Sequence, residues 1–152
     1  MTTSSGVVPS SFRDPSGFLF WKDGMLYRRV SVMYRANYDH LMDLGLYDRP
    51  MDARLFVTDE EMPTEDGASN AVYKELRPDE IPFISYPYEG SFSQLKDAAL
   101  ATLEIQKRAL DFGMTLKDAS ASNVQFTKSK PTLIDTISLE RRGEGQTWPA
   151  HT

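Results

Sequence analysis

The run from Gln94 to Phe112 is the stretch that most constrains how this chain can fold. Ser91 and Gln94 have the spacing of a capping box, in which the Ser side chain accepts from a free backbone N–H and the Gln side chain reaches back. Gly113 follows the run, and glycine is favoured just past a helix end. The sequence therefore predicts a long helix, and its small alanines allow close packing. We expect its buried face to comprise Leu95, Ala98, Ala99, Leu103, Gln106, Ala109 and Leu110.

Composition restricts the kind of protein that carries this helix. The 152 residues suit one domain of ordinary size, and 40% of them are apolar. The formal net charge is −5 with acidic and basic residues interspersed, which argues against nucleic-acid binding. With no cysteine and two histidines, the chain offers neither disulfides nor a multi-histidine zinc site. It has no apolar run near the roughly 20 residues of a membrane span and no secretory signal, so we expect a cytoplasmic protein without a membrane partner.

The N-terminal third predicts a hairpin followed by a helix. Residues 1–17 are rich in Ser, Thr, Pro and Gly, which predicts a flexible segment. Aromatic and apolar runs at 18–21 and 25–30 flank Asp23-Gly24, a strong signal for a tight turn between antiparallel strands. This hairpin is either a plain structural element or a cover over a phosphate. Residues 31–47 carry apolar side chains at three- and four-residue steps, which predicts an amphipathic helix.

The middle of the chain alternates short β-like runs with polar loops. Residues 55–57 and 71–76 are expected to form short strands, and the acidic, turn-rich residues 58–70 between them are expected to be a mobile loop. Two prolines in residues 81–90 restrict regular pairing there to a short or edge strand, in the first half of that run. Residues 85–90 are expected to be an ordered connector into the long helix. This mixture of elements predicts a soluble α+β fold.

Residues 116–135 carry the clearest pattern of chemical groups. Asp118 and Asn123 lie in a run of small and polar residues, and two β-like runs around a polar turn then lead to Asp135. Because a hairpin brings its two ends together, Asn123 and Asp135 are expected to be close in space. Magnesium prefers oxygen ligands and commonly takes one or two carboxylates, completed by water and phosphate oxygens. Asp118, Asn123 and Asp135 are therefore the residue types of a magnesium–phosphate site.

The Asp-x-x-x-x-Asn spacing, the hairpin and the apolar strand into Asp135 together resemble the catalytic segment of the protein-kinase-like superfamily, closest to its aminoglycoside-phosphotransferase-like branch. The resemblance implies that Asp118 occupies the catalytic base position. It also implies that Asn123 and Asp135 are the ligands of a magnesium ion that is bound with an ATP-like nucleotide.

The same resemblance implies an architecture. The predicted elements follow one another as a hairpin, a helix, short strands, a connector and a long helix. This order is similar to that of a small β-rich lobe with one helix, a hinge and the start of a second lobe. We therefore expect a truncated protein-kinase-like α+β fold, with an incomplete second lobe in a domain at 18–142 and a frayed tail at 143–152. Lys74 and Arg29 (or its neighbour Arg28) are the candidate nucleotide-binding cations. The family's residues flanking Asp118 and Asp135 are missing. The incomplete second lobe would leave no platform for an acceptor substrate, so we do not expect phosphotransferase activity.

Over nearly all of residues 12–142 the chain is also similar to the N-terminal part of bacterial class I S-adenosylmethionine-dependent methyltransferases related to a rhizobial nodulation protein. The runs that carry this resemblance are FRDPSGFLFWKDGMLYRRV, IPFISYPYEGSFSQLKDAAL and DASASNVQF. In those proteins the methyltransferase domain lies further along, and this chain has no glycine-rich strand-turn-helix for the cofactor. S-adenosylmethionine would then bind only in a domain not present here, for which this chain would be a partner.

Three functions remain open from the sequence. The chain is a kinase-like module that binds a phosphorylated small molecule with magnesium, or a non-catalytic accessory module of a methyltransferase. The third alternative is a structural α+β domain in which Asp118 caps a turn and Asp135 ends a strand. An incomplete second lobe would leave the apolar face of the 94–112 helix partly uncovered, which predicts self-association.

Overall fold

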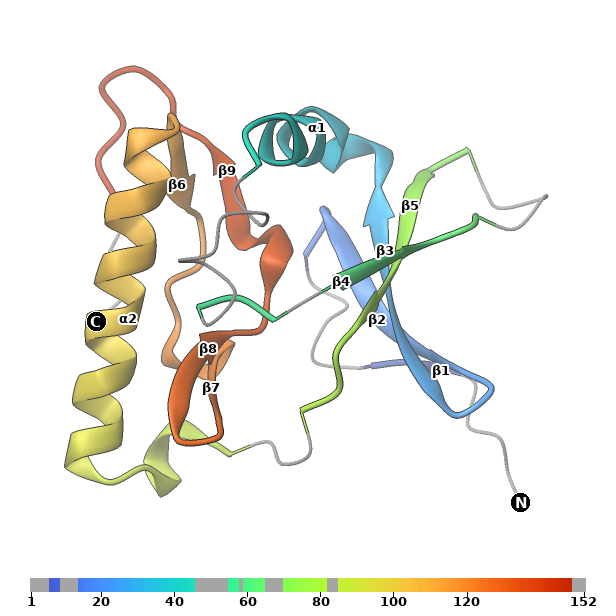
Figure 1. The fold of residues 1–152 in the computed structure, drawn as a ribbon. Coiled ribbons are helices and arrows are strands. Elements are labelled where there is room, and N and C mark those ends of the chain that lie inside the picture. Colours follow the sequence, from blue (N-terminus) through green and yellow to red (C-terminus); the bar gives the residue numbers. More distant parts are fainter. Residues whose placement is uncertain are drawn as a thin grey trace. The chain divides into compact units, whose positions relative to one another are not determined.

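The computed structural model describes residues 6–8, 14–45, 55–57, 59–64, 70–81 and 85–148. They form an antiparallel five-stranded sheet, two α-helices and two small two-stranded sheets (Figure 1), which confirms the predicted α+β class. The chain divides into two compact units, Met1–His40 with Thr58–Glu80 and Leu41–Val57 with Ile81–Thr152. Within the described ranges, no helix is long and apolar enough to cross a membrane.

The first unit contains the five-stranded sheet, in the order β1-β2-β3-β5-β4. Strands β2 (Gly17–Lys22) and β3 (Met25–Ser31) form the predicted hairpin. Asp23 and Gly24 join them with φ of 53° and 76°. Positive φ at both turn positions gives a twist that matches paired strands, which is why an Asp-Gly pair favours this turn.

Strand β1 (Gly6–Val7) pairs with β2 at one edge of this sheet. It lies inside residues 1–17, which the sequence predicted to be flexible. The prediction differs from the structure here because the Ser-, Pro- and Gly-rich composition gives no sign of a two-residue strand whose pairing partner lies in another segment.

Strand β4 (Asp59–Met62) forms the other edge and pairs with β5 (Val72–Pro78). The prediction of a mobile acidic loop is therefore wrong for these four residues. Acidic side chains of β4 form ion pairs with cations of β5, Glu60 with Arg77 and Glu61 with Lys74. Charged residues are also common on edge strands, where they discourage pairing with other chains.

Helix α1 (Arg35–Asp43) follows a single 3-10 turn and confirms the helix predicted within 31–47. In the first unit, the Tyr38 hydroxyl donates to Glu61 Oε2 at 3.3 Å. Burial of the phenol and the nearby Glu61 carboxylate raise the pKa of Tyr38, so the hydroxyl stays a donor across the physiological pH range. This contact joins α1 to the acidic edge strand.

The second unit is organised by helix α2 (Phe92–Asp111), which contacts β6 and the β7–β8 hairpin (Figure 1). The predicted capping box is confirmed, because Ser91 Oγ accepts from the backbone N–H of Gln94 and Gln94 Oε1 accepts from the N–H of Ser91 at 2.9 Å. Gly113 has φ of 69° immediately after the helix. The remaining elements are β6 (Met114–Leu116), β7 (Val124–Thr127), β8 (Lys130–Leu133), β9 (Leu139–Arg141) and the 3-10 helices η2 (Val32–Tyr34), η3 (Pro87–Glu89), η4 (Ala121–Asn123) and η5 (Thr136–Ser138).

Strands β6 and β9 pair with each other, as do β7 and β8. The β7–β8 hairpin was predicted, and its turn residues Lys128 and Ser129 have φ of 50° and 65°. A left-handed conformation costs a non-glycine residue roughly 1–2 kcal/mol. The hairpin is therefore stabilised by its pairing and by packing against α2. The buried core of this unit includes Ile105, Met114, Leu116, Leu133, Ile137 and Leu139.

The face that α2 buries differs from the predicted one. Ala98, Gln106 and Ala109 are buried as expected, together with Ala101 and Ile105. The other four predicted members are exposed, which makes that part of the prediction wrong: Leu95, Ala99, Leu103 and Leu110. The helix carries two apolar stripes, and periodicity alone does not say which of them packs against the strands.

Three smaller predictions, at residues 55–57, 81–84 and 143–152, can also be compared with the structure. Phe56 forms a single parallel bridge with Leu133 in place of a strand at 55–57. Residues 143–146, predicted to be a frayed tail, form a turn in which Gln146 N–H donates to Gly143 O at 3.2 Å and Gln146 Oε1 accepts from Gly143 N–H at 2.9 Å. The strand predicted at 81–84 lies, apart from its first residue, outside the described residues.

Candidate functional site

The β7–β8 hairpin brings Asn123 and Asp135 together at its open end, as the sequence predicted. Val124 pairs with Leu133 at the base of the hairpin. One residue further out, the N–H of Ile134 donates to the carbonyl oxygen of Asn123 at 2.9 Å. Asp135 follows directly in the chain, so the hairpin fixes the backbone of both candidate ligands.

The side chain of Asn123 contains a buried polar atom that needs a partner. Its Nδ2 is buried, and it donates to no acceptor within the described residues. A buried donor without an acceptor costs about 1–3 kcal/mol, and such groups in native proteins call for a specific explanation. A phosphate oxygen bound beside Asn123 is one explanation, because it would accept from Nδ2 and leave the amide oxygen for a cation.

Asp118 begins the loop that leads to this hairpin. Its Oδ1 accepts from the N–H of Ser120 at 2.9 Å. The Ser120 hydroxyl in turn contacts the hydroxyl of Ser122 at 2.6 Å. An Asp that accepts from the N–H two residues on forms an Asx turn, so the contact expected for a turn-capping role is present. The same contact fixes the direction in which the carboxylate points.

The side-chain oxygens of Asn123 and Asp135 are too few to bind magnesium alone, and they suit it only when a phosphate supplies further ligands. The described residues contain no group of three or more His, Cys, Asp and Glu side chains that could hold a metal ion. An amide oxygen from Asn123 and a carboxylate from Asp135 would leave the remaining positions to water and phosphate oxygens, which is how magnesium is commonly bound with nucleotides. The chain can therefore supply part of a magnesium–phosphate site.

Lys74 lies in the first unit and already has an acidic partner. Its Nζ forms an ion pair with Glu61 and lies 5.6 Å from the centre of the Tyr73 ring. The hydrogen bond to Glu61 raises the pKa of Lys74, which is therefore a cation at neutral pH. A phosphate that binds Lys74 would have to compete with Glu61.

Arg29 is held in a similar way on the opposite face of the same sheet. Its Nη2 lies 2.8 Å from Oε1 of the buried Glu75, and its guanidinium lies 4.8 Å from the centre of the Phe20 ring. Arg29 pairs with Glu75 and Val30 pairs with Lys74 in the register of β3 and β5. Because neighbouring strand residues point to opposite faces, Arg29 and Lys74 do not share a face.

Gln125 is a buried polar residue that sequence reasoning missed. It is 2% exposed. Its Oε1 accepts from the N–H of Ser85 at 2.9 Å, and its Nε2 donates to the carbonyl of Ser85 at 3.0 Å and to that of Ser122 at 3.3 Å. The side chain thus ties the connector before α2 to the loop that carries Asp118. In the sequence, a Gln between Val124 and Phe126 looks like the solvent-facing position of an alternating strand.

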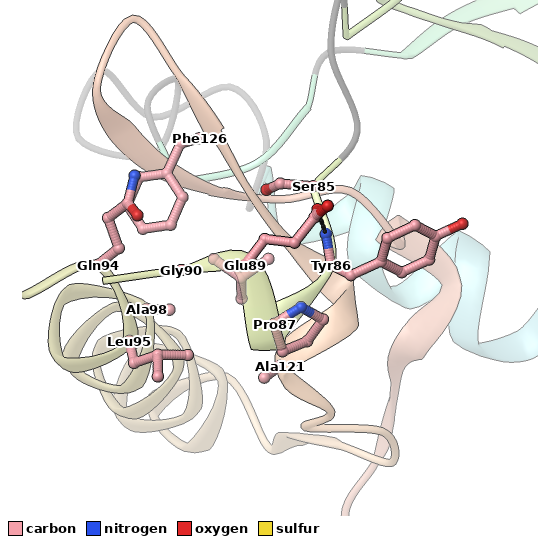
Figure 2. A pocket seen from close by; sticks show the side chains of 11 residues that line it. Ser85, Tyr86, Pro87, Glu89, Gly90, Gln94, Leu95, Ala98, Ala121 and Phe126 are labelled. Carbon is pink, nitrogen blue, oxygen red and sulfur yellow. Dashed lines mark hydrogen bonds between the residues drawn. The ribbon is translucent and has the colours of Figure 1, made fainter. Parts of the chain in front are cut away.

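A pocket of about 290 Å³ lies in the second unit, at the N-terminal end of α2 (Figure 2). Leu95 and Ala98 line it from the helix, and Phe126 lines it from the hairpin. Its polar side chains already serve the local turns, since Glu89 Oε2 accepts from the N–H of Tyr86 at 2.8 Å, drawn as a dashed line in Figure 2. Sequence reasoning did not predict this pocket, because its walls come from three separate stretches of the chain: residues 85–90, the start of α2 and residues 121–126.

No model of a protein family matches the chain. The chain is similar to the nodulation protein NoeA of Rhizobium meliloti (strain 1021), with 37% identity over 150 residues. The match covers 96% of this chain and 31% of that protein, so the chain spans less than a third of the length of its relative. An identity of this level over nearly the whole chain shows that it is related to a rhizobial nodulation protein.

Proposed function

We propose that this chain is a kinase-like module of a NoeA-related protein, in which Asn123 and Asp135 hold magnesium together with a phosphorylated ligand such as ATP. The observation that carries the proposal is the open end of the β7–β8 hairpin. There the N–H of Ile134, the residue before Asp135, donates to the Asn123 carbonyl, and the buried Nδ2 of Asn123 donates to no acceptor in the described part of the chain.

The order of the elements supports the kinase-like part of the proposal. A five-stranded sheet with one helix is followed by a connector, a long helix, a polar loop and a hairpin, in the order that the resemblance implies. When bound, magnesium would neutralise charge on the phosphate oxygens. Asp118 would occupy the position that orients an acceptor hydroxyl. The contacts of Lys74 and Arg29 with a nucleotide stay predictions, and the proposal concerns binding and not transfer.

Thermal unfolding with magnesium and ATP tests this proposal. A ligand present at about 100 times its dissociation constant stabilises the folded state by about 2.7 kcal/mol, which for a chain of this size raises the melting temperature by about 5–10 °C. The Asp135→Asn substitution should abolish the shift, because the neutral amide is a poor replacement for a carboxylate ligand. Asp135 makes no side-chain capping bond to η5, so the substitution removes no helix cap.

The matched control for this experiment is Asp97→Asn, on the exposed surface of α2. It removes the same charge from the same unit and should keep the full shift. If millimolar ATP with magnesium leaves the melting temperature of the unsubstituted chain unchanged, the magnesium–nucleotide proposal is wrong.

A second candidate function is a non-catalytic accessory module for an S-adenosylmethionine-dependent methyltransferase domain. The observation that favours it is the match itself, which covers 31% of the relative and leaves most of that protein outside the similarity. If a full-length protein with this segment transfers methyl groups, we expect deletion of the segment to lower that transfer, and we expect this chain alone to bind no S-adenosylmethionine in calorimetry. Unchanged methyl transfer after the deletion, or tight cofactor binding by the chain alone, would contradict this function.

A further inference from the structure

Helix α2 presents a second apolar stripe to solvent, which we call the outer stripe: Phe92, Leu95, Leu103 and Leu110. Successive members lie three, eight and seven residues apart, which are sums of three- and four-residue helical steps, so their side chains share one side of the helix. The residues are 83%, 42%, 53% and 41% exposed, respectively. Ala101 and Ile105 pack in the core on the other side of α2, whereas Gln106, three residues after Leu103, is buried at the edge of the stripe, where its side chain bonds to β6. A contiguous row of large exposed apolar side chains is a feature of interaction surfaces in soluble proteins.

The pocket at the N-terminal end of α2 continues this stripe. Leu95 belongs to both, since it lines the pocket and is partly exposed. The walls beyond it include the apolar side chains of Pro87 and Phe126 (Figure 2) and of Val124, beside the polar Ser85 and Glu89. The polar side chain Gln94 is engaged with the N–H of Ser91 at the helix start. A pocket of about 290 Å³ with such walls suits one aromatic or branched apolar group rather than a charged ligand.

Two lysines lie along one side of the outer stripe. Lys96 and Lys107 are exposed and lie about three turns apart, so both project from the same edge of the stripe. Within the ranges that the structure describes, neither forms an ion pair. Three acidic residues also lie on α2: Asp97 follows Lys96 directly, Asp111 lies four residues after Lys107, and Glu104 is paired with Arg108 at 2.7 Å. Around the helix axis the two lysines are nearer to the outer stripe than these carboxylates, so the charged groups that border the stripe on this side are the lysines.

We propose that the outer stripe and the pocket dock an amphipathic helix of a protein partner. The apolar face of that helix lies along α2, one of its large apolar side chains enters the pocket, and carboxylates on its flank meet Lys96 and Lys107. Helices commonly bind in this way, with apolar anchors at helical spacing and charged flanks that set orientation. This surface is independent of the proposed magnesium site.

The charges argue against a second copy of this chain as the occupant. Two α2 helices packed antiparallel about the centre of the outer stripe would bring Lys96 of one copy close to Lys107 of the other. A parallel pair would place each lysine beside its own counterpart. Both arrangements bring like charges together, which is unfavourable at an interface, whereas an acidic flank is complementary to both lysines.

The test uses the full chain and a synthetic helical peptide as the probe. The peptide carries leucines at helical spacing, a terminal tryptophan and glutamates three turns apart beside the leucines, and its control has lysines for the glutamates. Fluorescence anisotropy should show the glutamate peptide binding about 3–30 times more tightly than the lysine peptide, from two exposed ion pairs. The double substitution Lys96→Glu with Lys107→Glu should reverse this preference. Equal binding of the two peptides, or a preference that survives the charge reversal, overturns the proposal.

Two matched leucine variants test the stripe. Leu103→Ser should weaken binding of the glutamate peptide about tenfold, because it removes a large apolar contact. Leu100 is similarly exposed, at 55% against 53% for Leu103, but lies beyond the lysines, so Leu100→Ser should change binding less than about twofold. Helical circular dichroism checks that both variants fold. The proposal is overturned if both variants lose peptide affinity equally, or if the peptide does not bind at all. It is also overturned if sedimentation shows that the chain self-associates and that Leu103→Ser abolishes this self-association.

Discussion

Replacing Gln125 with glutamate is expected to lower the free energy of unfolding by about 3 kcal/mol or more at neutral pH. The amide nitrogen of Gln125 donates to the carbonyl oxygens of Ser85 and Ser122 at 3.0 and 3.3 Å, and the side chain is 2% exposed. A carboxylate oxygen in the same place has no proton to donate and faces two carbonyl oxygens. It also carries a charge that burial removes from water, which is costly without a cationic partner.

This loss should depend on pH in a defined direction. Burial and the two carbonyl oxygens disfavour the charged form of the introduced carboxyl, so its pKa in the folded state lies above the value of about 4.3 for an unfolded glutamate. Between those two values the folded state binds more protons than the unfolded state, and the stability of the variant therefore falls as the pH rises. We expect a small loss near pH 4, where the carboxyl is protonated and can donate, and the full loss near pH 8.

Urea unfolding at several pH values measures this effect, and Gln94→Glu is the matched control. Gln94 is exposed, and its Oε1 accepts from the N–H of Ser91, which a carboxylate oxygen does equally well. The control should therefore change stability by less than about 0.5 kcal/mol. Equal losses in the two variants would show that the Gln125 amide does not join the connector to the loop.

Replacing Leu133 with alanine is the second large expected effect, a loss of about 2–5 kcal/mol. Leu133 is 2% exposed. Its backbone N–H donates to Leu55 O at 2.6 Å, and its carbonyl accepts from Val57 N–H at 2.9 Å. The side chain lies where β8 meets α2, and its removal leaves a cavity there. Because β8 leads to Asp135, the variant should also reduce any stabilisation by magnesium and ATP.

Leu103→Ala is the control for this loss, since Leu103 is 53% exposed and lies on the outer stripe. Leu103→Ala removes the same atoms from the same unit, but these atoms make few buried contacts. The free energy of unfolding should therefore change by no more than about 0.5 kcal/mol. Denaturant midpoints for both variants measure the difference. A Leu133→Ala loss as small as that of Leu103→Ala would contradict the burial on which this prediction depends.

The parts of the fold that sequence predicted well depend on residues a few positions apart. The turn at Asp23-Gly24 forms because these residues tolerate positive φ. The start of α2 forms because Ser91 and Gln94 cap each other. In the candidate site, Asn123 bonds to Ile134, the residue before Asp135, because a short turn joins the two strands of the hairpin. In each of these, the stabilising partner is a near neighbour in the chain.

The parts that sequence missed depend on partners far along the chain. Acidic β4 looks like a loop until Arg77 and Lys74 stand opposite its carboxylates. Gln125 looks like a surface residue until the backbone of Ser85, 40 positions away, supplies a donor and an acceptor for its side-chain amide. The pairing of Arg29 with Glu75 across two strands likewise has no local signature.

The long helix shows which features the sequence determines and which depend on the tertiary structure. The sequence alone determined that residues near 92–111 form a capped helix with apolar side chains, because capping and helix propensity are local properties. It also determined that Asp118, Asn123 and Asp135 bracket one loop and hairpin. Only the tertiary structure decided which stripe of α2 is buried and which remains exposed, leaving Leu103 in solvent while Ile105 fills the core. Both stripes satisfy the same helical period, and the choice between them depends on the shape of the strands that pack against the helix.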